Sequence, residues 1–405
     1  MLVPKLRFKR EDGTDYPEWT KQKLSAVSSR VTRKNKGNIT DIPLTIASLY
    51  GLVDQREYFK KKIASRNMEG YYLLHNGEFA YNKSYSKGFD FGAIKRLDRY
   101  DCGALSTLYI CFAVNSKVDS NFMTHYFDSQ KWNKEVSIRC AEGARNHGLL
   151  NISTNDFFDI DMVLPTDLEE QHKIADFLSN VDEVIAQSEA EVANLQQQKK
   201  AAMQKIFSQE VRFKREDGTS YPEWENVKFG SLIKEYRDRT SIENEDVLLS
   251  SAISGMFLNT ELFGHQRGKS NIGYLKINYG TLILSAQNLH LGNANVNLRF
   301  EHGIISPAYK TYHITNCNLY FMAQWIKREK TNQFFYNATT VGASQCRRNV
   351  DWNALYKQSI LIPHLEEQQK IADFLSAYDE AISCAKQELD KWKELKKGLL
   401  QQMFA

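Results

Sequence analysis

The closest approach to a catalytic motif in this sequence is the run from Gly264 to Ser270, which reads GHQRGKS. A phosphate-binding loop needs four residues between its glycines so that backbone amides can wrap the phosphate groups, and this run has three. No clear strand precedes it. We therefore interpret Arg267 and Lys269 as part of a basic loop that faces a DNA backbone.

Other catalytic and metal-binding patterns are missing from the sequence. The chain has no Pro-Pro pair, so it lacks the Asn-Pro-Pro-aromatic or Asp-Pro-Pro-Tyr segment of amino-methyltransferases. A nuclease-like Glu-Leu-Lys at 394–396 falls on a heptad pattern, where a solvated helix face explains it. The six cysteines are scattered without metal-ligand spacing, which is typical of reduced thiols in a cytosol. We predict no catalytic site, no metal and no cofactor in this chain.

Side chains suited to DNA cluster in the non-periodic stretches of both halves of the chain. Arginine pairs well with guanine, asparagine and glutamine with adenine, and lysine with phosphate. The clusters around Arg145 and from Gln345 to Arg348 are the strongest, because each follows a matched Gly-Ala pair. For any single residue the alternative is a plain surface position. The candidates are Lys83, Lys87, Arg96, Arg99, Arg139, Arg145, Asn146 and His147 in the first half, and Arg267, Lys269, Gln287, Asn288, His290, Gln345, Arg347 and Arg348 in the second.

Two long heptad patterns must position these candidates, one from about 167 to 207 and one over the last 43 residues. A constant offset of 197 residues carries EEQHKIADFLS at 169–179 onto EEQQKIADFLS at 366–376. Two matching apolar seams are buried most simply by packing on each other as a coiled coil, and each helix would span on the order of 60 Å. The seam residues are Ile174, Leu178, Val181, Ile185, Val192 and Leu195 in the first helix, and Ile371, Leu375, Tyr378, Ile382, Leu389 and Trp392 in the second.

The whole chain reads as a tandem duplication. Residues 6–19, LRFKREDGTDYPEW, recur as VRFKREDGTSYPEW at 211–224, and fainter matches link the stretches between. Each copy consists of a leading segment, a globular domain and a long helix. If a two-fold axis relates the copies, the N-terminus should lie where the second helix finishes.

The globular domains mix strand-like and helical runs, which predicts an α+β fold. Strand-like runs are 105–114, 152–164, 281–286, 308–314 and 358–363, and a helical run is 318–329. The predicted segments are a leading segment at 1–19, a globular domain at 20–165, a central helix at 166–207, the repeated leading segment at 208–224, a second globular domain at 225–362 and a C-terminal helix at 363–405.

Charge is distributed unequally among these segments. Residues 20–165 hold 21 Lys and Arg against 15 Asp and Glu, and residues 225–362 hold 15 against 10. The helical segments are acidic, with 4 against 8 at 166–206 and 6 against 8 at 363–405. A polyanion would therefore be attracted to the globular domains and not to the helices.

The repeated EEQ-x-KIADFLS helix, with two diverged domains between its copies, resembles the specificity subunit of type I restriction–modification enzymes. The repeated RFKREDGT-x-YPEW is similar to segments of that family, and the resemblance covers the whole chain. It implies two target-recognition domains that read the halves of a bipartite double-stranded DNA site, separated by an antiparallel coiled coil. It also implies two methyltransferase subunits and restriction/translocase subunits as partners, and these would carry S-adenosylmethionine, ATP and magnesium.

The competing interpretation is a non-catalytic coiled-coil interaction scaffold without a DNA role, which would not need two basic, diverged domains. No apolar run approaches the length of a membrane span, and the N-terminal residues lack the apolar segment of a signal peptide. We expect a cytoplasmic protein without membrane contact.

Overall fold

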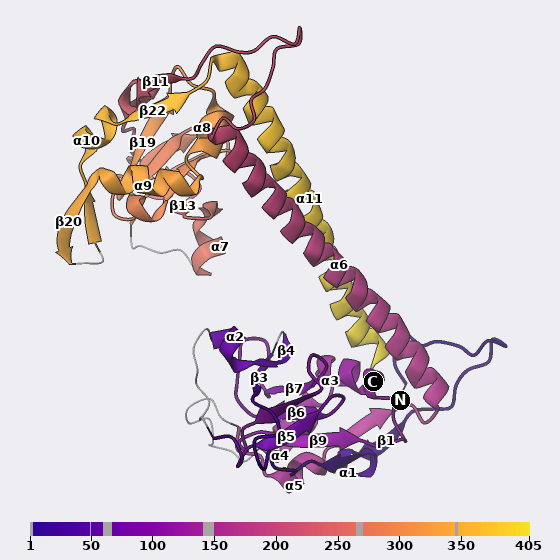
Figure 1. Cartoon of the computed structure of the whole chain (residues 1–405). Coiled ribbons are helices and arrows are strands. Elements are labelled where there is room, and N and C mark those ends of the chain that lie inside the picture. Colours follow the sequence, from indigo (N-terminus) through magenta and orange to yellow (C-terminus); the bar gives the residue numbers. More distant parts are fainter. Residues whose placement is uncertain (1–2, 49, 60–66, 141–149, 265–269, 345–346) are drawn as a thin grey trace. The chain divides into compact units, whose positions relative to one another are not determined.

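The computed structural model describes residues 3–48, 50–59, 67–140, 150–264, 270–344 and 347–405, and the side chains of 341–344 and 347 fall outside that description. The chain divides into two compact units. Unit 1 consists of residues 1–190 and 386–405, and unit 2 consists of residues 191–385. Each unit therefore combines one globular domain with one end of each of two long helices (Figure 1).

The globular domain of unit 1 contains two four-stranded sheets. The main sheet has the strand order β2-β9-β6-β7, and the second has the order β4-β3-β8-β5, in which β3 and β8 run parallel. A separate antiparallel pair joins β1 to β10. The strands are β1 (Thr20–Lys23), β2 (Ser28–Arg30), β3 (Pro43–Ala47), β4 (Gly51–Asp54), β5 (Tyr72–His75), β6 (Phe79–Asn82), β7 (Ala93–Arg96), β8 (Cys102–Leu105), β9 (Ile110–Val114) and β10 (Asp161–Leu164). The helices are α1 (Leu24–Val27), α2 (Gln55–Phe59), α3 (Ser120–Asp128), α4 (Asn133–Arg139) and α5 (Thr154–Phe158).

Unit 2 repeats this plan with a looser second sheet. Its main sheet has the order β12-β19-β16-β17, and β11 pairs with β22 as β1 does with β10. In place of the second sheet it has the pairs β13–β14 and β15–β18, linked by a single parallel bridge between Leu248 and Ile304. The strands are β11 (Glu225–Lys228), β12 (Ile233–Tyr236), β13 (Leu249–Ala252), β14 (Gly255–Leu258), β15 (Leu275–Asn278), β16 (Leu282–Ser285), β17 (Ala294–Val296), β18 (His302–Ile305), β19 (Tyr309–Ile314), β20 (Thr339–Ser344), β21 (Arg347–Val350) and β22 (Ser359–Ile362). The helices are η2 (Phe229–Leu232), α7 (Asn259–Phe263), η3 (Leu289–Leu291), α8 (Leu319–Trp325), α9 (Glu329–Asn337) and α10 (Trp352–Lys357).

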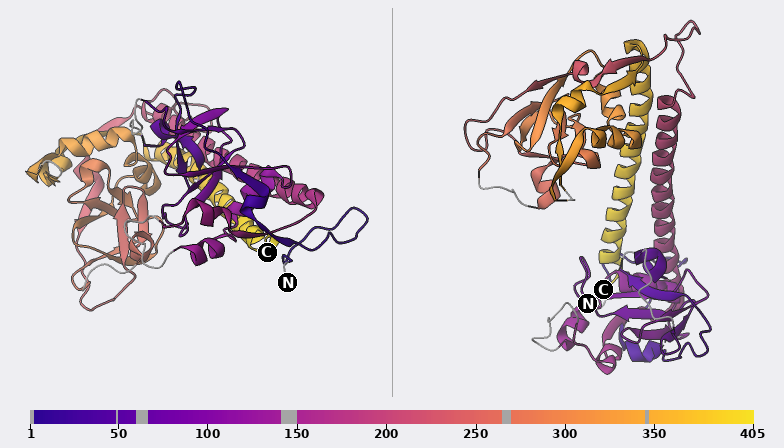
Figure 2. Two further views of the ribbon diagram at one scale, coloured as in Figure 1. Left: turned by 90° about the horizontal axis from the view of Figure 1, so that it is seen from below. Right: turned by 60° about the vertical axis from the view of Figure 1, so that its left-hand side comes forward.

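The long helices are α6 (Leu168–Phe207) and α11 (Leu365–Met403), and they lie side by side in antiparallel orientation (Figures 1 and 2). In unit 1, Lys396 Nζ lies 2.5 Å from Asp182 Oδ1. In unit 2, Lys199 Nζ lies 2.6 Å from Asp379 Oδ1. An offset of 197 residues converts one ion pair into the other, so the helix pair follows the pseudo-two-fold symmetry of the sequence. All twelve predicted seam residues are buried or half-buried.

A buried carboxylate fixes the leading segment of unit 1 to the first turn of α6. Arg7 donates from Nε and Nη2 to the two carboxylate oxygens of Glu170, at 2.6 and 2.9 Å, and also donates to the Pro17 carbonyl oxygen. The indole Nε1 of Trp19 donates to Glu170 Oε1 at 3.1 Å. Because the Glu170 side chain is fully buried, these donors must supply the hydrogen bonds that water would otherwise provide.

The same junction recurs in unit 2. Arg212 donates from Nε and Nη2 to the carboxylate of Glu367, at 3.2 and 2.9 Å, and Glu367 is again fully buried. The third donor is missing there, because Trp224 Nε1 is buried without a hydrogen-bond partner among the described residues. The repeated Arg and Glu of the sequence are therefore structural residues.

The ends of the long helices complete the cores of both units. Ile206 belongs to the core of unit 2, with Phe207 packed against it. Met403 and Phe404 belong to the core of unit 1, where the Phe404 ring lies 5.4 Å from that of Phe122.

The chain ends of unit 1 meet as the two-fold relation predicts. The Leu6 amide donates to the Gln402 carbonyl at 2.9 Å, as the Val211 amide donates to the Lys205 carbonyl at 3.2 Å in unit 2. The N- and C-termini consequently lie close together (Figure 2).

The predicted α+β class with two paired antiparallel helices is confirmed. The runs 281–286, 308–314 and 358–363 contain β16, β19 and β22, and 318–329 contains α8. The expectation of a strand over 152–164 is wrong for its first half, because Ser153 caps α5 by accepting from the Asp156 amide. A turn closed by the Tyr109 amide and the Ser106 carbonyl also splits the run 105–114 between β8 and β9. None of the described helices is long and apolar enough to cross a membrane.

Candidate DNA-recognition surfaces

The structure places predicted DNA-binding residues from both copies in the same loop of the repeated main sheet. Lys83 and Lys87 lie in the connection from β6 to β7, and Gln287, Asn288 and His290 lie in the connection from β16 to β17. β6 and β16 occupy the same position in their sheets, as do β7 and β17. The two loops are thus topologically equivalent but carry different polar side chains.

The β6–β7 loop presents its side chains around a short bridge between Ser86 and Phe89. Lys87 is exposed, and Lys83 is half-buried with its carbonyl accepting from the Leu150 amide at 2.9 Å. Tyr85, which the sequence analysis did not select, lies between the two lysines and is 58% exposed. The interleaving of basic and aromatic residues in KSYSK at 83–87 is the signal that could have identified it, since aromatic rings stack on nucleic-acid bases.

Two predicted arginines of unit 1 are occupied by internal contacts. Arg96 Nε lies 2.6 Å from Asp98 Oδ1, and its Nη1 donates to Ser120 Oγ at 2.8 Å. Arg139 Nη1 donates to Glu135 Oε2 at 2.6 Å, while its Nη2 donates to the Asp159 carbonyl at 2.9 Å. Both side chains hold together elements of the domain in this structure. Arg99 follows β7 and is exposed.

In unit 2 the structure brings the β16–β17 loop together with the β20–β21 hairpin. Gln287 and Asn288 are exposed at the end of β16, and His290 lies next to them in η3. Burial lowers the pKa of His290, and the nearby charge of Arg348 lowers this pKa further. The imidazole is therefore neutral at pH 7, and its Nδ1 is buried without a hydrogen-bond partner among the described residues, so this nitrogen is not available to DNA.

Arg348 is held in a fixed orientation on β21. Its Nε donates to Thr339 Oγ1 at 2.7 Å, its Nη2 donates to the Thr339 carbonyl at 3.1 Å, and its guanidinium lies 4.0 Å from the centre of the Tyr336 ring. Within the described part of the chain its contacts are with Thr339 and Tyr336, and it forms no ion pair with a carboxylate. A positioned arginine without a counter-charge is available for a base edge or a phosphate.

Seven predicted residues cannot be placed as side chains. Arg145, Asn146, His147, Arg267, Lys269 and Gln345 lie outside the described residues. The backbone of Arg347 pairs with Ser344 in the β20–β21 hairpin, and its side chain is outside the description.

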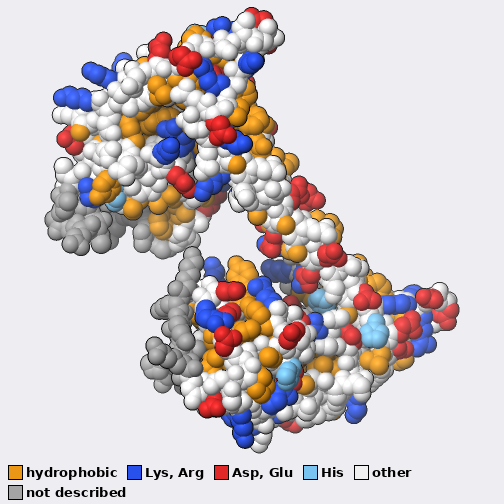
Figure 3. All heavy atoms as spheres, viewed as in Figure 1, with side chains coloured by type: hydrophobic (Ala, Val, Ile, Leu, Met, Phe, Trp, Pro, Cys, Tyr) orange, Lys and Arg blue, Asp and Glu red, His pale blue; other side chains and the backbone are white. Residues whose placement is uncertain are grey.

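The surface chemistry of both units is mixed. On the face shown in Figure 3, Lys and Arg side chains are interspersed with Asp and Glu over both units. Among the described residues, no group of His, Cys, Asp or Glu is arranged to hold a metal ion. The arrangement is that of a binding surface that combines separate polar and basic groups.

The chain is an internally duplicated two-domain protein, whose α+β domains share the strand order of their main sheet and are each combined with the ends of two long helices. Residues 187–393, about half of the chain, match the family model of the type I restriction modification DNA specificity domain. The chain therefore belongs to this family.

Individual relatives agree with this assignment. The specificity subunit of the type I restriction enzyme MjaVIII from Methanocaldococcus jannaschii is 24% identical over 278 residues. That alignment spans 62% of this chain and 63% of the relative, less than two thirds of its length. The S subunit of a type I restriction–modification system from M. genitalium has the same fold, with a TM-score of 0.56 at 14% identity, over 100% of this chain and 99% of the other. A chain from a structure on complex assembly and conformational transition of the type I R-M system gives a TM-score of 0.55 at 14% identity, over 95% of this chain and 97% of the other.

Proposed function

We propose that this chain is the sequence-reading subunit of a type I restriction–modification complex and contributes no catalytic residue. Each globular domain reads one half of a bipartite, asymmetric double-stranded DNA site. Two methyltransferase subunits and, in the restricting complex, restriction/translocase subunits dock on it. S-adenosylmethionine, ATP and magnesium are bound by those partners.

The observation that carries this proposal is the unequal divergence of the two copies. The junctions at Glu170 and Glu367 are held by the same bidentate arginine contact, whereas the equivalent β6–β7 and β16–β17 loops carry different polar groups. Base edges are discriminated by the identity and position of polar side chains. Two copies of one scaffold with different loops should therefore read two different half-sites.

The docking of two identical partners has its own support in a duplicated apolar patch. In unit 1 the Phe8 and Phe177 rings lie 5.6 Å apart, and in unit 2 the Phe213 and Phe374 rings lie 5.6 Å apart. Phe177 is 37% and Phe374 is 40% exposed. The equivalent helix-start residues are also exposed, Leu168 in unit 1 and Leu365 in unit 2. An apolar surface kept exposed in both copies is typical of a protein interface, and two equivalent patches fit two copies of one partner.

The reading function is tested by exchanging one domain. Replacing residues 225–362 by the equivalent domain of a relative should change one half of the methylated sequence and leave the other half unaltered. Methylated adenines are mapped by sequencing DNA from cells that carry either version with the partner subunits. A change in both halves would contradict separate reading, and a chain that binds no DNA in a gel shift, alone or with methyltransferase subunits, would favour a scaffold.

The docking patches are tested by titration with the methyltransferase subunit. Phe177→Ser and Phe374→Ser should each reduce the stoichiometry from two partner subunits per chain to one, as measured by analytical ultracentrifugation. Leu395→Ser is the matched control, because Leu395 is 48% exposed on α11 but its equivalent in α6 is Gln198. Unchanged stoichiometry in both phenylalanine variants would remove these patches as docking sites.

A further inference from the structure

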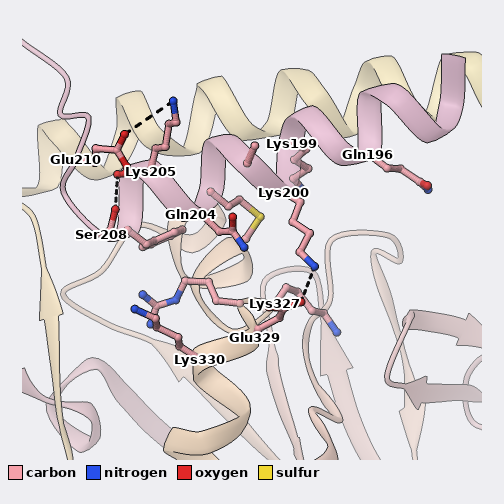
Figure 4. A pocket seen from close by; sticks show the side chains of 14 residues that line it. Gln196, Lys199, Lys200, Gln204, Lys205, Ser208, Glu210, Lys327, Glu329 and Lys330 are labelled. Carbon is pink, nitrogen blue, oxygen red and sulfur yellow. Dashed lines mark hydrogen bonds and ion pairs between the residues drawn. The ribbon is translucent and has the colours of Figure 1, made fainter.

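Unit 2 contains a basic pocket, and none of the residues that line it was predicted to read DNA. The last turns of α6 form one wall, from Gln196 to Phe207. The segment from Lys327 to Lys330, which leads from α8 into the first two residues of α9, forms the other (Figure 4). Its volume is about 660 Å³. A concave site of this size accommodates a ligand as large as a nucleotide.

The pocket is lined by an excess of cations. Its basic residues are Lys199, Lys200, Lys205, Lys327, Arg328 and Lys330, and its acidic residues are Glu210 and Glu329. Lys200 pairs with Glu329 at 2.6 Å and Lys205 approaches Glu210 at 3.9 Å (Figure 4). All four of these side chains are more than half exposed. Ion pairs at such exposure contribute little to stability, so both lysines can turn to an incoming anion at low cost.

Arg328 is the best positioned cation of the pocket. Its guanidinium lies 4.5 Å from the Phe207 ring centre and 4.8 Å from that of Trp325, and its Nε donates to the Trp325 carbonyl and to Thr331 Oγ1. Its two terminal amino groups have no acceptor among the described residues. Burial lowers the pKa of Arg328 to about 10, as expected where no carboxylate offsets the loss of water.

The flanking lysines add charge without internal carboxylate partners in the described part of unit 2. Most of the Lys327 side chain is exposed, but its ammonium group donates hydrogen bonds to the Ile253 carbonyl and to Asn295 Oδ1. The resulting loss of water lowers the pKa of Lys327 to about 8. Lys330 is exposed at the pocket and has no ion pair there. Three of the four residues from 327 to 330 are thus basic and line one small volume.

The first copy of the repeat shows that the scaffold does not require this charge. Counting from the matched Phe122 and Phe321, the places of Lys327 and Arg328 are taken in unit 1 by Asp128 and Ser129. Asp128 lies 2.6 Å from Lys95 and 4.0 Å from Lys396, so the corresponding region of unit 1 is neutralised internally. The basic pair of Lys327 and Arg328 is therefore specific to unit 2, whereas the place of Lys330 is taken in unit 1 by another lysine, Lys131.

We propose that this pocket binds a small phosphate-bearing anion, such as a nucleoside triphosphate or an inorganic polyphosphate. A planar guanidinium with free terminal amino groups matches two phosphate oxygens, and lysines around it match the remaining charge. The Phe207 ring and the Met203 side chain supply apolar surface beside the cations. A free ligand can enter a concave site between a helix and a loop, whereas the phosphates of a duplex lie along its convex outer surface. The site does not depend on how the chain reads DNA.

The test is isothermal titration calorimetry of the full chain with sodium tripolyphosphate and with ATP, at about 50 mM salt to limit screening. One site per chain is expected for each ligand. Arg328→Gln and Lys330→Gln should each weaken binding by about tenfold or more, because each removes a charge-assisted hydrogen bond. Lys131→Gln is the matched control, since Lys131 is the equivalent of Lys330 in unit 1, and it should leave the affinity unchanged.

Two further measurements separate loss of binding from loss of fold and from DNA contact. Thermal unfolding of each variant without ligand should match that of the original chain, and tripolyphosphate should raise the melting temperature of the original chain but not of Arg328→Gln. No heat of binding for the original chain, or equal affinity in Arg328→Gln and Lys330→Gln, would overturn the proposal. The proposal would also be wrong if binding of a 20-base-pair duplex required Arg328 and neither tripolyphosphate nor ATP bound the chain.

Discussion

The places where a leading segment meets a long helix are nearly the same in units 1 and 2, whereas the second sheets of the two units differ. At the junctions a buried glutamate receives two hydrogen bonds from an arginine in both copies. In the second sheets, the parallel pair of β3 and β8 in unit 1 is reduced to the single Leu248–Ile304 bridge in unit 2. A buried charge tolerates no loss of its partner, whereas each second sheet has kept an apolar core with a different strand pairing. The long helices and their junctions with the leading segments, which we call the frame, have therefore been retained, and the globular domains have diverged.

The largest effect is expected when the long helices are changed and the globular domains are left as they are. Inserting one heptad at matched positions of both α6 and α11 lengthens each helix by roughly 10 Å, at about 1.5 Å per residue. The preferred gap between half-sites should widen by up to about three base pairs, at about 3.4 Å per base pair, and the half-site sequences should stay the same. Methylation mapping on a library of spacer lengths measures both. Full activity on the original spacer would show that the helices do not set the gap.

A second test compares the two junctions directly. Glu170→Ala and Glu367→Ala should each lower the free energy of unfolding by about 1.5–3 kcal/mol, because each removes two charge-assisted hydrogen bonds from a half-buried arginine. The loss should be greater by about 1 kcal/mol for Glu170→Ala, since Trp19 also loses its hydrogen bond and Trp224 has none to lose. Urea unfolding followed by tryptophan fluorescence measures the difference.

The control for the junction test is Asp15→Ala, whose carboxylate is 74% exposed and 3.6 Å from Lys9. An exposed pair of this kind contributes at most about 1 kcal/mol. If Glu170→Ala proved no more harmful than Asp15→Ala, the buried carboxylate would not hold the junction.

A third test concerns the diverged surfaces. Arg348→Ala should weaken DNA binding by about 1–3 kcal/mol and relax one position of one half-site if the side chain reads a base. If it contacts phosphate, binding to all sequences should weaken alike and the dependence on salt should decrease. The same prediction applies to Arg145 and Arg347. Fluorescence anisotropy with a matched duplex measures both effects.

Arg96→Ala is the control for this prediction, because Arg96 is occupied by Asp98 and Ser120. It should leave the recognised sequence unaltered. If the alanine variants of Arg145, Arg347 and Arg348 all kept the original affinity and sequence preference, none of the three arginines would be a DNA contact.

The smallest expected effect comes from a pair of equivalent residues in the frame. His125 of unit 1 takes the place of Gln324 of unit 2, and Asp182 and Lys396 face it as Asp379 and Lys199 face Gln324. Burial lowers the pKa of His125, Lys396 and Arg96 lower it further, and Asp182 and Asp128 oppose this. As pH falls below about 6.5, the unfolded chain gains a proton that folded His125 resists, so stability is lost by at most about 1.4 kcal/mol per pH unit.

His125→Gln should remove this acid sensitivity by making unit 1 resemble unit 2 at that position. The two chains are compared by urea unfolding at pH 7, 6 and 5. The difference in unfolding free energy between them should change in favour of the variant as pH decreases. A difference that does not vary with pH would show that His125 is protonated in the fold as readily as in the unfolded chain.

The long helices were predictable because their pattern is repetitive. The heptad steps and the 197-residue offset place the first helix at about 167–207, and α6 runs from Leu168 to Phe207. The globular domains were less predictable, because a single cap can override an apolar run, as Ser153 does before α5. The pairing of their strands depends on contacts far apart in the sequence.

The candidate site shows the same limit. A list of basic residues cannot separate Arg348, which has no carboxylate partner in the described structure, from Arg139, which is paired with Glu135. The four-residue spacing of Glu135 and Arg139 was a visible signal of that ion pair. The KREK run at 327–330 was equally visible, but its meaning depends on the end of α6, which only the fold brings beside it.

The end of the chain contacts unit 1, for example through the hydrogen bond between Leu6 and Gln402. These contacts determine the order in which the two cores are completed during synthesis. The core of unit 2 receives Ile206 and Phe207 before the rest of its own domain has been made. The core of unit 1 receives Met403 and Phe404 only after the whole of unit 2 has left the ribosome. The domain that is translated first is therefore completed last, and until then the surface around Trp19 and Phe122 that Phe404 will cover stays open. A chain that stopped between residues 386 and 402 would lack part of the core of its N-terminal unit and not of its C-terminal one.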